Sequence, residues 1–470
     1  MRPILGAAAA VASLWLLGRG LRAVLPLRRD DEHPIESLGL DFLFGAGAGS
    51  LIFFAVALRS NAWAFRSVYV LTLALAVAAA VRGRLAPSLR ADRSWFWGAL
   101  AMLAAVHVVR GIVGSFTSDG YAHWGLKSKA IFAAGRIPAD ILVDAERFGY
   151  ALPDYPLLWP VIEVWTYLHM GALNDQVVRL LGSAFLLALG AVFYGRLRAA
   201  CGATASLAAT FLLLAPHQWA RSGASGLAEP PLSAFLFAGF AALAAFAEKP
   251  SPRAAAQAAL LLGFAAWTKN EGAAAAAVGG AIFAWLALDT GLGPEGPPAS
   301  GGRVPPCGTA PCQGRARAPK RIALFALLAA LPSIPWLLFR QAHGISGYFA
   351  AGVAPISEAG IRLKLIAVAF VRNCGEIKGW MFVWPVLLLG VAFGFRAIRT
   401  MPAGRVLLAG ALGTLLAYLV ALLLSPLDAG WQIPTALPRL LMQVEAPLLA
   451  CLALAAARRD DAPQVDTKHR

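Results

Sequence analysis

The sequence has few charged residues and few cysteines. Asp, Glu, Lys and Arg together make up 14% of the 470 residues, whereas hydrophobic residues make up 59%. Soluble domains contain about 25% charged residues, so this scarcity and a mean hydropathy of +0.65 exclude a set of soluble domains. Of the five cysteines only Cys307 and Cys312 lie close together. No second pair and no nearby histidine gives these two the spacing of a zinc site, and we interpret them as an incidental loop pair.

Acidic residues are scarce as well. The chain has 25 Asp and Glu against 41 Lys and Arg, which gives a formal net charge of +16. In a soluble protein such an excess suggests a nucleic-acid partner. Here the basic residues gather in alternate gaps between apolar runs, as the positive-inside rule predicts for cytoplasmic loops. These gaps are 82–93, 196–198, 249–253, 303–321, 396–405 and 458 onward. We therefore expect no nucleic-acid partner.

What the sequence has in abundance is long apolar runs, each about the length of a membrane span. Thirteen are predicted, at 4–26, 38–58, 62–81, 95–116, 177–195, 203–217, 228–247, 254–268, 272–288, 322–340, 379–396, 404–424 and 441–457. The first lacks a clear cleavage site and is interpreted as a retained helix. The run 156–173 would put Arg196 and Arg198 outside if it spanned the membrane, so we expect a juxtamembrane or half-inserted helix there. The predicted fold class is an all-α polytopic membrane protein with about 13 transmembrane helices.

The gap 117–156 falls on the extracytoplasmic side of this topology and contains "SDGYAHWGLKSKA". It presents Asp119, His123 and Lys127 directly after an apolar run. Ser118 or Asp119 could simply cap the following helix. A carboxylate held at the membrane surface could also act as a general base toward a hydroxyl or amine, and the two interpretations are compatible.

Two further outer segments place acids beside prolines. "PDYPLLWP" contains Asp154 and Tyr155, and it could be a turn leading into a helix. "AEPPLSAFL" puts Glu229 at the start of a helix, where a carboxylate is favourable even without a function. Both acids are candidates for a site at the outer face.

The last two outer segments carry cations. "WTKNEG" places Lys269, Asn270 and Glu271 between two apolar runs; snorkelling would explain Lys269 alone, but three consecutive polar residues suggest a lined cavity. "LDAGWQIPTALPRLLMQ" contains Trp431 and Arg439. Arg439 could pair with Asp428, or it could bind an anionic group such as a phosphate, which arginine holds through two parallel hydrogen bonds.

Acids, bases and aromatic residues thus concentrate in five outer segments that are far apart in the sequence. Such a distribution is what a convergent site requires. We therefore expect the five segments to meet at one face of the membrane.

The motifs "SDGYAHWGLKSKA", "PDYPLLWP", "AEPPLSAFL", "WTKNEG" and "LDAGWQIPTALPRLLMQ", in this order, resemble the bacterial branch of the GT-C class of membrane glycosyltransferases. This branch includes the protein mannosyltransferases and the lipid A aminoarabinose transferase. The resemblance runs from about residue 95 to 457. The chain departs from the bacterial pattern at Leu152, where a His is usual, and at Ala436 and Pro438, where a Ser and an Asp are usual, so acceptor contacts are not carried over.

The resemblance implies a function, and together with the apolar runs and the Gly-, Pro- and Arg-rich composition of 289–320 it divides the chain. Residues 1–94 are additional transmembrane helices, 95–288 form the first part of the catalytic core, 289–320 form a flexible cytoplasmic linker, 321–457 form the C-terminal helices and 458–470 form a cytoplasmic tail. The implied donor is a sugar on a polyprenyl phosphate, transferred with inversion to a lipid, glycan or protein acceptor. The protein would act in the bacterial inner membrane, surrounded by membrane lipids, with its site on the extracytoplasmic face.

The site residues follow from the same resemblance and from the outer segments. Asp119 matches the catalytic base of the class. The expected substrate-binding residues are His123, Lys127, Asp154, Tyr155, Glu229, Lys269, Glu271, Trp431 and Arg439. No cofactor is expected; a role for a divalent metal stays open, since the loops contain no Asp-x-Asp pair.

Two other functions fit the same residues. A transporter or flippase of lipid-linked sugars would also carry buried charges along its path, but we find no internal repeat of the helix pattern. A polymerase or ligase of surface polysaccharide would use a diphosphate-linked lipid. The choice of donor would separate it from the glycosyltransferase.

Overall fold

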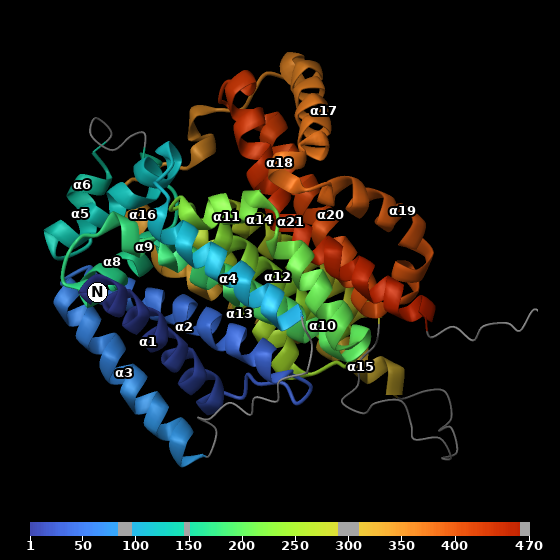
Figure 1. Ribbon diagram of the computed structural model, residues 1–470, viewed down its shortest axis with the longest axis horizontal. Coiled ribbons are helices and arrows are strands. Elements are labelled where there is room, and N and C mark those ends of the chain that lie inside the picture. The colour runs from blue at the N-terminus through green and yellow to red at the C-terminus, as the bar shows by residue number, and fades with distance from the viewer. Residues whose placement is uncertain (83–95, 145–150, 290–309, 461–470) are drawn as a thin grey trace, which may run out of the picture.

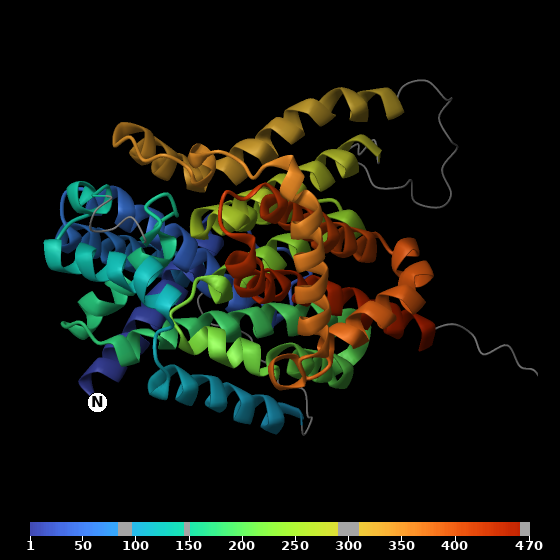
Figure 2. The same cartoon turned by 90° about the horizontal axis from the view of Figure 1, so that it is seen from above.

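The computed structural model describes residues 1–82, 96–144, 151–289 and 310–460. Within these residues the chain is 85% helical and contains no strand, so the predicted all-α class is confirmed. The long helices share one general direction (Figure 1), whereas α17 (Ala359–Gly375) lies across that direction in both views (Figures 1 and 2). Most of the expected linker, and residues 461–470 of the expected tail, lie outside the described residues.

Ten helical segments of the described chain are long and apolar enough to cross a membrane. The protein is therefore an integral membrane protein. The segments are Arg2–Val24, Pro34–Ala57, Asn61–Val81, Asp175–Leu214, Glu229–Glu248, Asn270–Asp289, Ala318–Ala342, Val383–Thr400, Pro402–Leu424 and Ala429–Arg458.

The expected count of 13 is not confirmed, for three local reasons. The apolar helix Trp97–Val113 within α4 (Phe96–Val113) and the 17-residue α13 (Pro252–Thr268) are shorter than the ten. The two runs predicted at 177–195 and 203–217 belong to one helical segment that includes α10 (Leu180–Leu214). Gly202 interrupts α10 with φ 74° and ψ 173°, a conformation open to glycine. The chain folds back there, since a methyl group on Gly190 would lie 2.8 Å from Leu214 Cδ1.

The first three helices pack closely on one another. They are α1 (Arg2–Val24), α2 (Pro34–Ala57) and α3 (Asn61–Val81). A methyl group on Gly18 would lie 1.7 Å from Asp41 O, and one on Gly45 would lie 1.7 Å from Leu14 O. Glycines at these positions therefore let the backbones of α1 and α2 touch, as small residues do between membrane helices.

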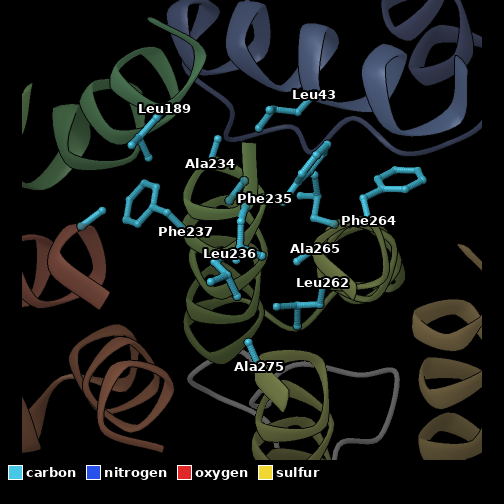
Figure 3. Close-up of a cluster of buried hydrophobic side chains, with 14 of the residues drawn as sticks. Leu43, Leu189, Ala234, Phe235, Leu236, Phe237, Leu262, Phe264, Ala265 and Ala275 are labelled. Carbon is cyan, nitrogen blue, oxygen red and sulfur yellow. The ribbon is translucent and has the colours of Figure 1, made fainter. Parts of the chain in front are cut away.

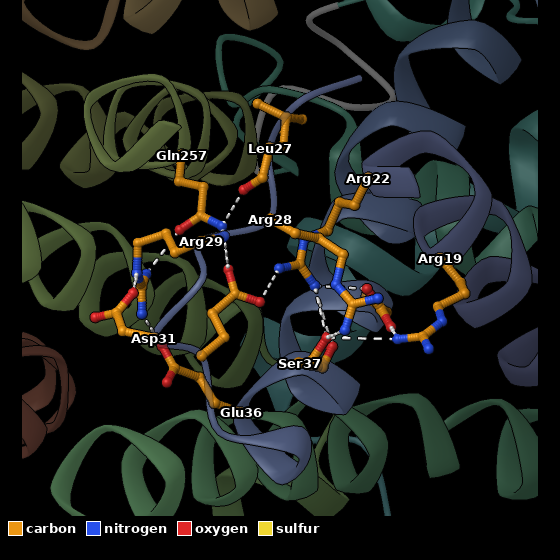
Figure 4. A network of polar contacts seen from close by, with 11 residues as sticks. Arg19, Arg22, Leu27, Arg28, Arg29, Asp31, Glu36, Ser37 and Gln257 are labelled. Carbon is orange, nitrogen blue, oxygen red and sulfur yellow. Dashed lines mark hydrogen bonds and ion pairs between the residues drawn. The ribbon is translucent and has the colours of Figure 1, made fainter. Parts of the chain in front are cut away.

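A buried ionic network joins the α1–α2 loop to α13 (Figure 4). Arg22 bonds Asp41 at 2.5 Å, and Arg29 bonds Glu36 at 2.5 Å and Gln257 of α13 at 2.7 Å. Removing one partner from such a network leaves a buried charge without compensation. The network therefore holds the first helices to the rest of the bundle at this end.

α12 (Glu229–Glu248) lies at the centre of the bundle. Its Phe235 and Phe237 point toward helices on either side, and Phe235 meets Phe264 of α13 with ring centroids 5.7 Å apart (Figure 3). Gly239 allows close approach of α13, since a methyl group there would lie 2.7 Å from Leu262 Cγ. This packing fixes the ends of α12 and α13, where candidate site residues lie.

The remaining helices complete the bundle and its outer end. In the first half they are α5 (Leu126–Ala134), α6 (Ala139–Leu142), α8 (Leu158–Met170), α9 (Asp175–Val178), α11 (His217–Ala224) and α14 (Asn270–Asp289). In the second half they are α15 (Ala310–Ala330), η3 (Leu331–Ser333), α16 (Ile334–Ala342), η4 (Tyr348–Ala351), η5 (Ile356–Glu358), α18 (Ile377–Trp380), α19 (Val383–Thr400), α20 (Pro402–Leu424) and α21 (Ala429–Asp460).

Two of these elements bear on the sequence predictions. α8 has 13 residues and rises about 20 Å, which is short of the roughly 30 Å hydrocarbon core, and it is not among the ten candidate spans. α21 begins at Ala429, so most of the outer segment 425–440 is helical despite Pro434 and Pro438. Prolines are tolerated in membrane helices where neighbouring helices satisfy the freed backbone groups, and α21 packs on α10, α19 and α20.

Candidate functional site

Asp119 lies at the start of an unusual helical segment. Six residues, Gly120–Gly125, form the π-helix η1 before α5 begins. A methyl group on Gly120 would lie 2.0 Å from Ser225 O, so only glycine fits where η1 crosses the end of α11. π-Helical turns are rare and occur often at functional sites. The sequence prediction did not include this segment.

The capping interpretation of Asp119 is wrong. The Asp119 side chain makes no capping hydrogen bond. The amide of Gly120 donates instead to Thr117 Oγ1 at 3.1 Å. The carboxylate is therefore available for another partner.

That partner is Arg439 of α21, 320 residues further along the chain. Arg439 Nη1 donates to Asp119 Oδ2 at 2.6 Å, and both side chains are about a quarter exposed or less. The alternative pairing of Arg439 with Asp428 is not found, since Asp428 Oδ1 accepts a hydrogen bond from the Trp431 amide at 2.8 Å. The start of η1 and the N-terminal part of α21 thus meet at one end of the bundle.

Glu229 links this pair to the α13–α14 turn. It is fully buried at the start of α12. Its Oε1 lies 2.9 Å from Lys269 Nζ and 3.9 Å from Arg439 Nε, while its Oε2 has no hydrogen-bond partner. Glu229 is therefore more than a favourable charge at a helix start, because it bridges the two cations.

Lys269 is buried between two carboxylates. It is 6% exposed and bonds Glu271 Oε1 at 2.8 Å in addition to Glu229. Burial alone lowers a lysine pKa, but the two carboxylates outweigh burial and raise the pKa of Lys269. The ammonium therefore stays charged and points inward, and the snorkelling interpretation is wrong.

Asp154 and Tyr155 reach the same turn from the loop before α8. Asp154 is 4% exposed and accepts a hydrogen bond from Asn270 Nδ2 at 3.0 Å. The Tyr155 ring lies with its centroid 5.8 Å from Lys269 Nζ and meets the Trp124 ring edge-on at 5.5 Å. Asn270 was noted in the sequence only as part of its motif, and its contact assigns it to the cluster.

His123 and Lys127 complete the group on η1 and α5. Burial lowers the pKa of His123 to about 4 against the opposing effect of Asp119, with Lys127, Arg439 and Lys269 lowering it further. The imidazole is therefore neutral at pH 7. Lys127 is 1% exposed, and burial lowers its pKa to about 7 despite the charge of Asp154.

The structure thus brings together nine of the ten predicted site residues, which we call the polar cluster. They are Asp119, His123, Lys127, Asp154, Tyr155, Glu229, Lys269, Glu271 and Arg439. Trp431 is the exception: its side chain is 55% exposed, and none of the hydrogen bonds, ion pairs or ring contacts found in the described chain joins it to the cluster. Trp431 lies on the first turn of α21, which begins at Ala429, earlier than the predicted run 441–457.

A second group of titratable residues lies beside the polar cluster, under α5. Glu163 of α8 is 1% exposed, and its Oε2 has no hydrogen-bond partner. Burial raises the pKa of Glu163 to about 8, against a hydrogen bond with Ser128. Nearby, Lys129 pairs with Asp175 at 2.6 Å. A lone acid in the apolar run 156–173 was the sequence signal for this group.

Across the described ranges, no three His, Cys, Asp or Glu side chains come together in a way that could hold a metal ion. Cys307 lies outside the described residues, so the loop pair cannot be placed.

Comparison with known proteins adds nothing to the geometry of the polar cluster. No protein-family model, no curated protein and no solved structure matches it, and the comparisons assign the chain to no family.

Proposed function

We propose that this protein is a membrane glycosyltransferase that transfers a sugar from a polyprenyl-phosphate donor to an extracytoplasmic acceptor, with inversion at the anomeric carbon. The observation that carries the proposal is the meeting of Asp119, Glu229, Lys269 and Arg439 at one end of the bundle. Four distant segments supply them. A carboxylate next to two cations suits a reaction in which an acceptor loses a proton while a phosphate gains charge.

In the proposed reaction the Asp119 carboxylate takes the proton of an acceptor hydroxyl or amine. The acceptor atom forms a bond to the anomeric carbon while the bond from that carbon to the phosphate oxygen breaks. The electron pair of the broken bond leaves with the polyprenyl phosphate. A single displacement of this kind inverts the anomeric configuration.

The two cations would bind the phosphate of the donor. Arg439 lies between Asp119 and Glu229, and its guanidinium has five donors in a fixed plane, so it can keep one carboxylate while it bonds a phosphate oxygen. Lys269 approaches the same carboxylate of Glu229 from the α13–α14 turn. The charge that develops on the leaving phosphate would then meet groups already oriented by the fold.

The distribution of basic residues supports an extracytoplasmic location for the cluster. Arg196 pairs with Glu248 at the end of α12 opposite Glu229. Arg458 lies at the far end of α21 from Arg439 and bonds Thr400. Cytoplasmic ends of membrane helices are enriched in Lys and Arg, which favours the opposite end, that of the polar cluster, as the outer one.

One observation favours flipping of a lipid-linked sugar as a second candidate function. Gln443 and Glu445 are fully buried within α21. Both polar atoms of the Gln443 side chain and Oε1 of Glu445 lack a hydrogen-bond partner. Polar side chains inside a membrane span often mark a translocation path.

The decisive experiment uses purified protein in proteoliposomes with synthetic donors. One donor carries a monosaccharide on polyprenyl monophosphate and another an oligosaccharide on polyprenyl diphosphate. We expect release of polyprenyl phosphate and transfer of sugar from the first donor only. Transfer from the diphosphate donor alone would indicate a polymerase or ligase, and donor movement across the bilayer without sugar transfer would indicate a flippase.

The role of Asp119 is tested in the same assay with Asp119→Asn. This variant keeps the shape of the side chain but cannot take a proton. Turnover should fall by roughly 10²–10⁴-fold, with donor binding largely retained. Asp140→Asn is the matched control, because Asp140 lies in the same outer segment, 65% exposed in an ion pair with Arg136. Near-normal turnover in Asp119→Asn would exclude Asp119 as the base.

A further inference from the structure

Leu152 has an unusual backbone conformation directly beside the polar cluster. Its φ is 51°, one of three positive values among non-glycine residues of the described chain. A branched side chain is strained in this region, and Leu152 also precedes a proline. The strained residue opens a turn in which the Tyr155 amide donates to Leu152 O at 3.1 Å.

Lys127 holds this turn from α5. Its ammonium donates to the same carbonyl, Leu152 O, at 2.6 Å. The ammonium also lies 5.6 Å from the centroid of the Trp124 ring, one of whose edges meets Tyr155. With 1% of its surface exposed, Lys127 is enclosed by the groups that it holds, and little of it can meet a substrate.

The turn at Leu152 also fixes two residues of the polar cluster. Asp154 follows Leu152 by two positions and accepts the hydrogen bond of Asn270. Tyr155 places its ring over Lys269. The conformation of Leu152 thus sets how the loop before α8 meets the α13–α14 turn.

We infer that Lys127 is a positioning residue: its ammonium holds the left-handed turn at Leu152 and so orients Asp154 and Tyr155 toward Asn270 and Lys269. This role differs from the direct substrate contact that the sequence predicts for Lys127. The part of the inference that concerns turnover rests on the proposed function, whereas the part that concerns the turn does not.

The test pairs Lys127→Met with a second substitution, Leu152→Gly. Methionine keeps the length of the side chain and removes the donor. Glycine adopts positive φ without strain, so the double variant should keep the turn without the ammonium. Lys129→Met is the control, because Lys129 is two residues away and bonds Asp175 instead.

The first readout is hydrogen exchange of a peptide that covers 151–158 in the purified protein. The measurement is made at pH 6, where Lys127 with its pKa of about 7 is charged; loss of a hydrogen bond from a charged donor should then raise exchange in Lys127→Met about tenfold or more. Leu152→Gly should reverse most of this rise, and Lys129→Met should match the wild type. Unchanged exchange in Lys127→Met would overturn the inference whether or not the protein transfers sugar.

The second readout is the division between KM and kcat for the donor. Lys127→Met should lower kcat about tenfold through the displaced turn while donor KM changes little, and Leu152→Gly should restore kcat. A large rise in donor KM that Leu152→Gly does not restore would identify Lys127 as a phosphate ligand and overturn the positioning role. If the wild type transfers no sugar, the proposed function fails, and the exchange readout alone decides the inference.

Discussion

Individual residues of the polar cluster differ in how far the sequence could predict them. The acids and cations stood out because strongly polar residues are costly next to membrane spans. Their partners could not be predicted, because pairing depends on which helix ends meet. Arg439, for example, has Asp428 close to it in sequence. Asp428 lies just before the start of α21 and accepts a hydrogen bond from the Trp431 amide, whereas Arg439 pairs with Asp119.

Glu163 gives a prediction about pH at the residue scale. Burial raises the pKa of Glu163 from 4.5 to about 8. Between these values the folded protein holds a proton on Glu163 that the unfolded chain has lost, so the contribution of Glu163 to stability falls as the pH rises through this window. Glu163→Gln has no such proton and should lose less stability than the wild type between pH 5 and 9.

The measurement is thermal unfolding of both proteins in detergent across that range. The difference in unfolding free energy between variant and wild type should grow with pH by a few kcal/mol, since one pKa unit corresponds to about 1.4 kcal/mol. Other groups, including Lys127, are present in both proteins and cancel in the difference. Parallel pH curves would show that Glu163 is ionised throughout the range.

At the scale of elements, the sequence predicted most long helices but not their irregularities. The apolar runs mark membrane helices directly. The apolar runs gave no sign of the π-helix η1, at which Ser225 of a distant segment lies so close that a methyl group on Gly120 would be 2.0 Å from Ser225 O. The reversal of α10 likewise rests on a single residue, Gly202, in a run whose hydrophobicity hardly changes.

Gly120→Ala tests the contribution of η1. The added methyl group would lie 2.0 Å from Ser225 O, so η1 must shift and weaken the 3.2 Å hydrogen bond from Thr117 N to Ser225 O. Overpacking of this kind costs about 1–3 kcal/mol, and the displaced Asp119 should also lower sugar transfer.

Thermal unfolding and the transfer assay measure the two effects. Gly98→Ala is the control: Gly98 lies on α4, nothing lies within 4 Å of the added carbon, and alanine favours a helix. Wild-type stability and activity in Gly120→Ala would mean that η1 adapts and that its geometry is not required.

At the scale of the whole molecule, the two ends of the bundle carry different kinds of ionic network. The polar cluster is partly exposed and lies where α12 begins. The network of Arg22 and Arg29 is buried and lies where α13 begins (Figure 4). The sequence predicted that basic residues gather at this end, but it could not predict that acids from the same loop enclose them.

Arg29→Met should destabilise the molecule strongly. Arg29 pairs with Glu36 and Asp31 and bonds Gln257 of α13. Its loss leaves the buried Glu36 carboxylate without its ion-pair partner, which costs about 3–5 kcal/mol. Arg253→Met is the matched control at the same end, because its ion pair with Asp30 is largely exposed and such pairs contribute about 0–1 kcal/mol. Equal thermal unfolding of the two variants would contradict a stabilising role for the network.

The contact between Asp119 and Arg439 has a consequence for biosynthesis. The two residues are 320 positions apart, and ribosomes add about 5–20 residues per second. Asp119 is therefore added to the chain roughly 16 to 64 s before Arg439. Once Glu229 and Lys269 have also been made, Glu229 has Lys269 as its partner while Arg439 is still missing. A chain that stops before α21 lacks Arg439, so Asp119 loses its ion-pair partner and Glu229 keeps the single cation Lys269.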